Sequence, residues 1–162
     1  MWLTKKILIP VDLSGGSSRR ACDVGVELAE MHGVSLVLVH VVPETSVSYS
    51  GVPYVPTPEY TQFIEDTARK SLRDEAKRLQ GRGVEIETVL KVGRAWEEIV
   101  DLAKRLDAGL IVMGTHGRRG LSRALLGSVA EKVVRLSPVP VLTVSAVDED
   151  DDKKSAPSLE AK

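Results

Sequence analysis

The chain has 162 residues, 43% of them hydrophobic, a size and composition typical of one globular domain with one core. Its 22 Lys and Arg residues against 23 Asp and Glu residues leave a net charge of -1, so overall charge gives no reason to expect nucleic acid or a membrane surface as a partner. The single cysteine, Cys22, the lack of a secretory signal and the lack of an apolar run of roughly 18 residues favour a soluble cytoplasmic protein.

The first part of the chain predicts a strand, a helix and a second strand. Residues 5–11 are a β-branched run that ends in the turn-rich residues 12–18. A helix follows and stops at Gly33. Residues 35–42 are apolar almost throughout, as in a strand buried on both faces of a parallel sheet. The buried face of the helix is expected to hold Ala21, Val24, Gly25, Leu28 and His32.

Residues 43–58 contain four prolines and predict an irregular surface loop. Thr57 is a predicted helix N-cap, followed by a first-turn proline and acid. The charged amphipathic helix that starts there is expected to stop near Gly81 or Gly83. Residues 84–90 alternate between apolar and polar types and predict the third strand.

Two further helices and two further strands complete the pattern. Gly93 opens a helix, and residues 109–114 form a buried strand. Residues 128–136 predict the last helix, and residues 139–144 the last strand. The apolar faces of the two helices are expected to hold Trp96, Ile99, Val100 and Ala103, and Val129, Val133, Val134 and Leu136.

Strands that alternate with helices predict a parallel sheet with helices on both faces, because parallel neighbours need a crossover connection. We therefore expect one doubly wound α/β domain over residues 1–146, with a five-stranded parallel sheet in the order 3-2-1-4-5. Residues 147–162 are an acidic tail without periodicity and are expected to be disordered. Ligands of such sheets bind beyond the carboxyl ends of the strands, where the winding order reverses.

A glycine-rich segment follows the fourth predicted strand and leads to the last helix. Gly114, Gly117 and Gly127 permit close approach of backbone amides to a ligand, and Ser128 stands at a helix N-terminus, which favours an anion. Arg118 adds positive charge, together with two neighbouring arginines, Arg119 and Arg123. The segment predicts a phosphate-binding loop.

The spacing G-x2-G-x9-G-S of Gly114, Gly117, Gly127 and Ser128 resembles the nucleotide-binding signature of the ATP-binding universal stress proteins. The resemblance spans nearly the whole folded chain. It includes Lys-Ile-Leu-Ile-Pro-Val-Asp-Leu-Ser at the start, His-Val at the end of strand two, Val-Gly before the third helix and Pro-Val-Pro-Val-Leu near the end.

The resemblance implies a bound ATP, with adenine near Asp12 and Val41 and ribose near Pro10 and Gly114. It implies a triphosphate along the glycine-rich segment, with Mg²⁺ or Mn²⁺ held by the phosphates and water. The residues expected to bind the nucleotide are Pro10, Val11, Asp12, Val41, Met113, Gly114, His116, Gly117, Arg118, Gly127, Ser128 and Val129.

Several of these residues also have structural interpretations. Ser128 and Glu131 could form a capping box of the last helix, and Asp12 could cap the first. His40 is interpreted as a packing or surface residue, and Cys22 as a small buried hydrophobe.

The function expected is a regulatory, ATP-binding universal stress protein with at most slow hydrolysis, because no Walker lysine or obvious base accompanies the loop. One alternative is an adenylating enzyme, since residues 14–18 resemble the S-G-G-x-D-S loop of the ATP-pyrophosphatases, although Ser18 stands where that family has aspartate. Another is an interaction module that binds no nucleotide. A homodimer is expected through the last strand, at Val139, Val141, Leu142 and Val144.

Overall fold

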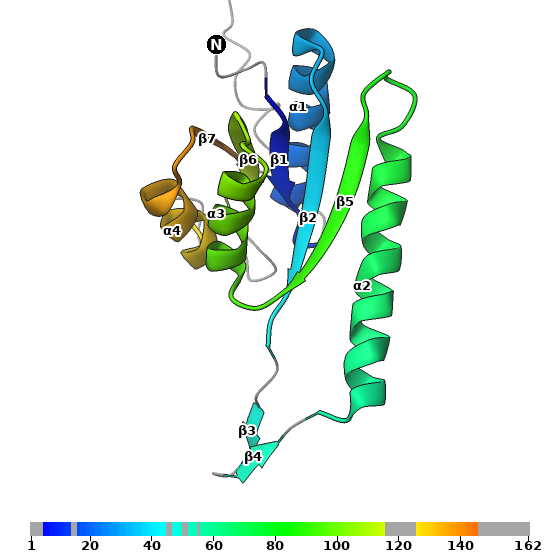
Figure 1. Cartoon of the computed structure of the whole chain (residues 1–162), viewed down its shortest axis with the longest axis vertical. Coiled ribbons are helices and arrows are strands. Elements are labelled where there is room, and N and C mark those ends of the chain that lie inside the picture. Colours follow the sequence, from blue (N-terminus) through cyan, green and yellow to red (C-terminus); the bar gives the residue numbers. More distant parts are fainter. Residues whose placement is uncertain are drawn as a thin grey trace, which may run out of the picture.

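The computed structural model describes residues 5–13, 16–44, 47–49, 52–54, 56–115 and 126–145. Five parallel strands form the central sheet, in the order β5-β2-β1-β6-β7 (Figure 1). Their bounds are β1 Ile7–Pro10, β2 Leu36–Val42, β5 Ile86–Val92, β6 Leu110–Gly114 and β7 Val141–Val144. Numbered among themselves, these strands have the predicted order 3-2-1-4-5, so the predicted fold class is confirmed.

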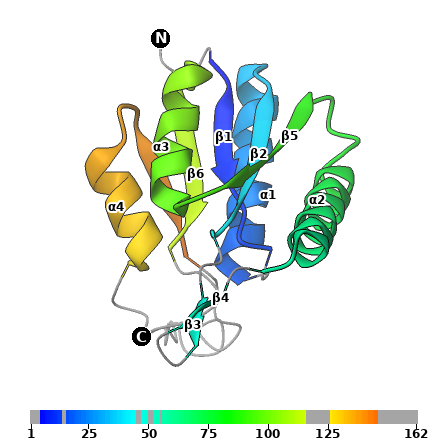
Figure 2. The same ribbon diagram turned by 60° about the horizontal axis from the view of Figure 1, so that its bottom comes forward.

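In the described part of the chain, four helices cover the sheet. They are α1 Gly16–His32, α2 Pro58–Arg78, α3 Ala95–Arg105 and α4 Ser128–Leu136. The buried residues of α1 and α2 pack on one face, and those of α3 and α4 on the other (Figure 2). Among the described residues, no helix is long and apolar enough to cross a membrane.

Successive residues of the central strands point into the two cores alternately. Ile7 and Ile9 of β1 pack against α1 and α2, whereas Leu8 between them packs against α3 and α4. All three side chains are fully buried. Because both faces of the strand are covered, its sequence is a continuous apolar run instead of an alternating one.

Helix α1 includes the last three residues of the stretch predicted to be a loop, residues 16–18, and it buries Ser17 and Ser18 in its first turn. Ala21 and Gly25 are buried as predicted, and Val24 and Leu28 pack against the core from its margin. His32 was expected on the buried face but is exposed in the last turn. The buried face is completed by Cys22, Val26 and Ala29.

The predicted irregular loop over residues 43–58 contains two short strands, β3 Val47–Tyr49 and β4 Val52–Tyr54, which pair antiparallel. The prediction of a purely irregular segment is wrong there. Pro53, opposite Ser48, concealed the pairing, since proline occurs in strands mainly at unpaired edges. Thr57 caps α2 as predicted, its hydroxyl oxygen accepting a hydrogen bond from the Tyr60 amide.

Other boundaries and faces also differ from the prediction. The last strand, β7, begins at Val141 instead of at residue 139. β5 runs from residue 86 to 92 instead of 84 to 90, because it pairs with β2 along its whole length, from Leu36 with Ile86 to Val42 with Val92. In α4, Val133 is buried, but Val134 and Leu136 are each 45% exposed. These last two side chains form apolar surface instead of core.

Candidate functional site

The winding order of the sheet reverses between β1 and β6. The chain leaves β1 toward β2 on one side, while β6 pairs with β1 on the other, with Ile7 opposite Leu110. The carboxyl ends of β1 and β6 therefore lie next to each other, as expected of a switch point in a doubly wound sheet (Figure 2). The strand order thus brings the Pro10 end of β1 next to the Gly114 end of β6, which the sequence analysis proposed as two walls of one crevice.

The turn after β1 is held from both sides. The Val11 amide donates to the Val39 carbonyl at 2.8 Å, and the Val11 carbonyl lies 2.6 Å from Nδ1 of His40. The Asp12 amide donates to Oγ of Ser18, in the first turn of α1, at 3.1 Å. Asp12 lies four residues before the first residue of α1, so the interpretation of Asp12 as the N-cap is wrong.

Leu13 follows with a φ of 61°, in the left-handed region that side-chain-bearing residues rarely adopt. Its side chain packs against the core between the sheet and helices α1 and α2. This packing holds a conformation that costs roughly 1–2 kcal/mol for an L-residue. Strain of this kind is typical of functional turns.

Gly114 allows β6 to approach the start of α1. A Cβ on Gly114 would lie 2.6 Å from Ser17 Oγ and 2.9 Å from both the Ser17 carbonyl carbon and the Ser18 amide nitrogen. The two backbones could not keep this separation with any other residue at position 114. The glycine expected beside the ribose therefore also sets the position of the turn that contains Asp12.

The N-terminus of α4 has a glycine as its N-cap residue. This residue, Gly127, has no side chain to cap the helix, and no side-chain cap is found there among the described residues. The interpretation of Ser128 and Glu131 as a capping box is wrong, because Ser128 is the first helical residue. The Gly127 amide donates to the Thr115 carbonyl at 2.8 Å, so the amides of Ser128, Val129 and Ala130 are the first-turn donors that the helix itself leaves unused.

Most of the expected site residues are thereby located at the carboxyl end of the sheet or at the start of α4. They are Pro10, Val11, Asp12, Val41, Met113, Gly114, Gly127, Ser128 and Val129. His116, Gly117 and Arg118 lie outside the described residues. Sequence reasoning missed His40, whose position directly before Val41 was the available signal, and Ser18, whose role depends on where α1 begins.

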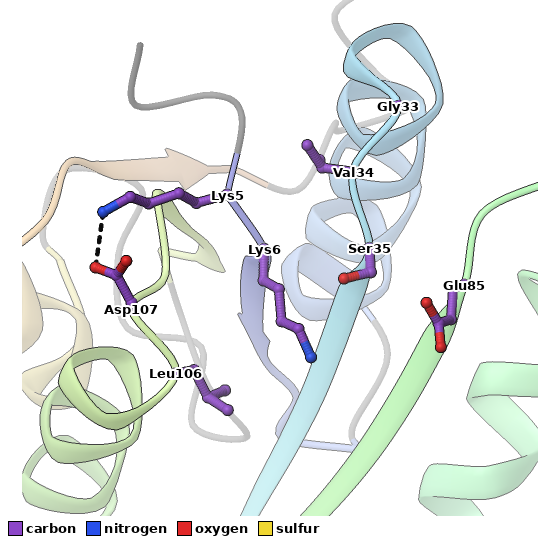
Figure 3. A pocket seen from close by; sticks show the side chains of 8 residues that line it. All are labelled: Lys5, Lys6, Gly33, Val34, Ser35, Glu85, Leu106 and Asp107. Carbon is purple, nitrogen blue, oxygen red and sulfur yellow. Dashed lines mark hydrogen bonds and ion pairs between the residues drawn. The ribbon is translucent and has the colours of Figure 1, made fainter.

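A cavity lies at the opposite end of the sheet. It has a volume of about 460 Å³ and is lined by residues at the amino ends of β1, β2 and β5 (Figure 3). Lys5 pairs with Asp107 at 2.7 Å, and Lys6 pairs with Glu87. With its lysines already paired, and far from the switch point, this cavity is a poor candidate for an anion site.

Among the described residues, no group of three or more His, Cys, Asp or Glu side chains could hold a metal ion. Cys22 is fully buried, as predicted, and burial together with the nearby Glu75 carboxylate raises the pKa of its thiol to about 12. It is therefore not a reactive thiol in the folded protein.

The model of the universal stress protein family matches residues 4–145. The chain belongs to this family. Universal stress protein YxiE of Bacillus subtilis is 35% identical over 145 residues, which cover 86% of this chain and 97% of that protein.

Solved structures of universal stress proteins have the same fold as this one. The structure of MJ0577, from Methanocaldococcus jannaschii, has a TM-score of 0.76 at 30% identity and covers 90% of this chain and 99% of its own. The Archaeoglobus fulgidus universal stress protein in complex with dAMP has a TM-score of 0.65 at 26% identity, covering 87% of this chain and 98% of its own. This family fold therefore accommodates an adenine nucleotide in at least one of its members.

Proposed function

We propose that this universal stress protein binds ATP at the switch point between β1 and β6 and that nucleotide occupancy regulates its contacts with partners. The observation that carries the proposal is the N-terminus of α4, whose N-cap residue Gly127 offers no capping side chain and which follows directly after the glycine-rich segment. Unused amides and the helix dipole at this position favour a polyanion. The dAMP complex of the Archaeoglobus fulgidus relative supports an adenine nucleotide as the ligand.

The residues of the site fit such a ligand. Gly114 keeps the end of β6 free of a side chain, and the amides of Ser128 and Val129 are available to phosphate oxygens. Asp12 and Val41 are proposed to contact the base. Mg²⁺ or Mn²⁺ would be held mainly by the phosphates and would neutralise part of their charge. Hydrolysis is expected to be slow at most, because the sequence lacks the lysine of a G-x4-G-K-[ST] loop.

A proline substitution tests the role of the α4 amides. Ser128→Pro removes one first-turn amide without harming the helix, since proline is favoured at the first helical position and Gly127 already has the extended conformation that it requires. We expect the affinity for ATP, measured by calorimetry with Mg²⁺, to fall by roughly 1.5–3 kcal/mol, as for a hydrogen bond to a charged group. Ser128→Ala, which keeps the amide, is the control. Equal affinities of the two variants would contradict the proposal.

The alternative adenylating enzyme is less well supported. It requires residues 14–18 to surround a pyrophosphate, but Ser17 and Ser18 are each only 4% exposed, and Ser17 lies against Gly114. The Ser18 hydroxyl oxygen accepts the Asp12 amide. If incubation with ATP gave AMP and pyrophosphate, the adenylating enzyme would be favoured. Slow formation of ADP, or no turnover, would favour the regulatory protein.

We also propose a homodimer through β7. This strand is an edge of the sheet, and Leu142 on it is 39% exposed, while Val134 and Leu136 are exposed apolar side chains of the neighbouring α4. Val139 and Val141 are partly buried and pack against the core between the sheet and helices α3 and α4. Val144 is buried in the core on the other face, so its side chain stabilises the fold and is not available to an interface. Pairing two such edges would satisfy their backbone groups and cover the apolar surface.

Light scattering coupled to size exclusion tests the dimer. Leu142→Glu is expected to convert the dimer to a monomer, because it places a charge on the exposed edge strand that the proposed interface would bury. Met31→Glu, at an even more exposed position in the last turn of α1, is the matched control and leaves the mass unchanged. A wild-type chain that elutes as a monomer would remove this part of the proposal.

A further inference from the structure

The pairing between β1 and β2 stops at the entrance to the candidate site. The amide of Val11 donates to the carbonyl of Val39, and the register ends with Pro10 opposite Val39. If the parallel ladder continued, the Val11 carbonyl would accept the next amide of β2 that faces β1, which is that of Val41.

His40 occupies that position in the ladder. Its Nδ1 lies 2.6 Å from the Val11 carbonyl oxygen. Because a carbonyl oxygen only accepts, Nδ1 carries the proton and donates it. An imidazole N–H of β2 thus takes the place of a backbone amide, and β1 leaves the sheet at this residue.

The hydrogen bonds on the other side of β2 determine which way Val41 faces. The Leu36 amide donates to Glu85, and the Val42 carbonyl accepts from Gly93, so the even-numbered residues of β2 direct their backbone groups toward β5. The backbone groups of a strand alternate between its two neighbours. The amide and carbonyl of Val41 are therefore directed toward the side that β1 vacates, next to Asp12.

We propose that His40 is a positioning residue for base selection, which ends the β1–β2 ladder so that the backbone amide and carbonyl of Val41 can pair with the edge of an adenine. Adenine has an N6 donor, which can bind the Val41 carbonyl, beside an N1 acceptor, which can bind the Val41 amide. Guanine in the same orientation has the reverse order: its O6 acceptor would face the carbonyl and its N1 donor would face the amide. The His40 hydrogen bond therefore sets the preference for adenine over guanine nucleotides. This inference rests on the proposed nucleotide site.

Two variants separate the hydrogen bond from the bulk of the side chain. His40→Asn can place an amide nitrogen near the position of Nδ1 and keep the donor. His40→Leu removes the donor and keeps similar volume. Urea unfolding of both variants shows whether the fold is kept, and the comparison of the two corrects for any general loss of stability.

Hydrogen exchange of the Val41 amide tests the effect on the ladder in the protein without nucleotide. In His40→Leu the Val11 carbonyl becomes available to that amide, so exchange is expected to slow by about tenfold or more relative to the wild type and His40→Asn. Nitrogen NMR of the wild-type imidazole is expected to show the proton on Nδ1. Unchanged exchange in His40→Leu, or a proton on Nε2 alone, would overturn the role of His40 in ending the ladder.

Calorimetry with ATP, GTP and tripolyphosphate tests base selection. We expect the ratio of ATP to GTP affinity to fall by about tenfold in His40→Leu, to stay within about threefold of the wild type in His40→Asn, and tripolyphosphate affinity to stay unchanged in both. A parallel loss of all three affinities would indicate a structural role and overturn the inference. A wild type that binds none of them would contradict the proposed function itself, while the exchange measurement would still report separately on the ladder.

Discussion

Gly114 at the end of β6 lies directly against Ser17 in the first turn of α1, and a Cβ at position 114 would reach within 2.9 Å of the Ser17 backbone. Because Ser18, the next residue, accepts the hydrogen bond of the Asp12 amide, the contact couples the end of β6 to the turn after β1. The relative position of the two walls of the candidate site thus depends on the lack of a side chain at position 114.

Gly114→Ala is therefore expected to lower both stability and ATP affinity. The new methyl group meets backbone, which cannot move aside as a side chain can, and the expected loss in the free energy of unfolding is about 1–3 kcal/mol. Gly33→Ala is the control: Gly33 has a φ of 64° but open space around it, so alanine there loses roughly 1 kcal/mol from backbone strain alone. Urea unfolding and ATP calorimetry measure both, and only Gly114→Ala should weaken ATP binding.

Gly25 makes a second close approach, between α1 and β1. A Cβ there would overlap Cδ1 of Ile9, and no backbone atom lies nearby. Gly25→Ala is expected to lose about 1–3 kcal/mol of stability. Ile9→Val removes the overlapping methyl group, so the double variant should be more stable than the sum of the two single losses predicts. Additive losses in a double-mutant cycle would contradict this account.

The sequence predicted the element types well where burial alone determines them. β1, β2 and β6 are covered on both faces, so their apolar runs identified them and the alternation with helices fixed the parallel sheet. The sequence predicted strand ends and helix faces less well where they depend on strand pairing or on the rotation of a helix about its axis. The ends of β5 depend on its register with β2, and the exposure of Val134 depends on which side of α4 meets the sheet.

The high pKa of Cys22 predicts a specific loss of stability in alkali. Burial raises the pKa of the Cys22 thiol from its usual 9.0 to about 12, so the folded thiol stays protonated over a range of pH in which the unfolded thiol loses its proton. Stability from this group is thus fully present below pH 9 and is lost as pH rises toward 12. Between pH 8 and 10, the unfolding free energy of the wild type relative to Cys22→Ala should fall by about 1–2 kcal/mol. A difference that stays constant over this interval would contradict the burial of the thiol.

Arg78 joins α2 to α1 and is expected to matter more than other surface arginines. Its Nη1 lies 2.7 Å from Asp23 and its Nη2 lies 2.6 Å from Glu75, and the hydrogen bond to Glu75 raises the pKa of the guanidinium. Arg78→Leu leaves the largely buried Glu75 carboxylate without its cation and should lower the unfolding free energy by about 1–3 kcal/mol.

Arg82→Leu is the matched control for Arg78. Arg82 is 47% exposed, and its guanidinium lies 3.8 Å from Glu27 and 3.7 Å from Glu30. Such exposed pairs contribute little, so we expect a change within about 0.5 kcal/mol in urea unfolding. Similar losses in the two variants would show that the Arg78 network adds nothing beyond a surface pair.

The candidate site was predictable in outline only. Gly114 and Ser128 could be identified because glycine spacing and the start of a helix are local features of the sequence. The hydrogen bond between His40 and Val11 could not, because it joins residues 29 positions apart across two strands. That Gly127 and not Ser128 is the N-cap of α4 depends on which residue begins the helix, and the capping-box interpretation placed the first helical residue one position too late.

The hydrogen bond from Gly127 to Thr115 ties together the two flanks of residues 116–125. Because this hydrogen bond joins the two flanks directly, a doubling of the length of chain between them costs only about 0.6 kcal/mol in closure entropy. β6 and α4 are therefore held at a fixed spacing by their own backbone, whatever the length of the chain that joins them.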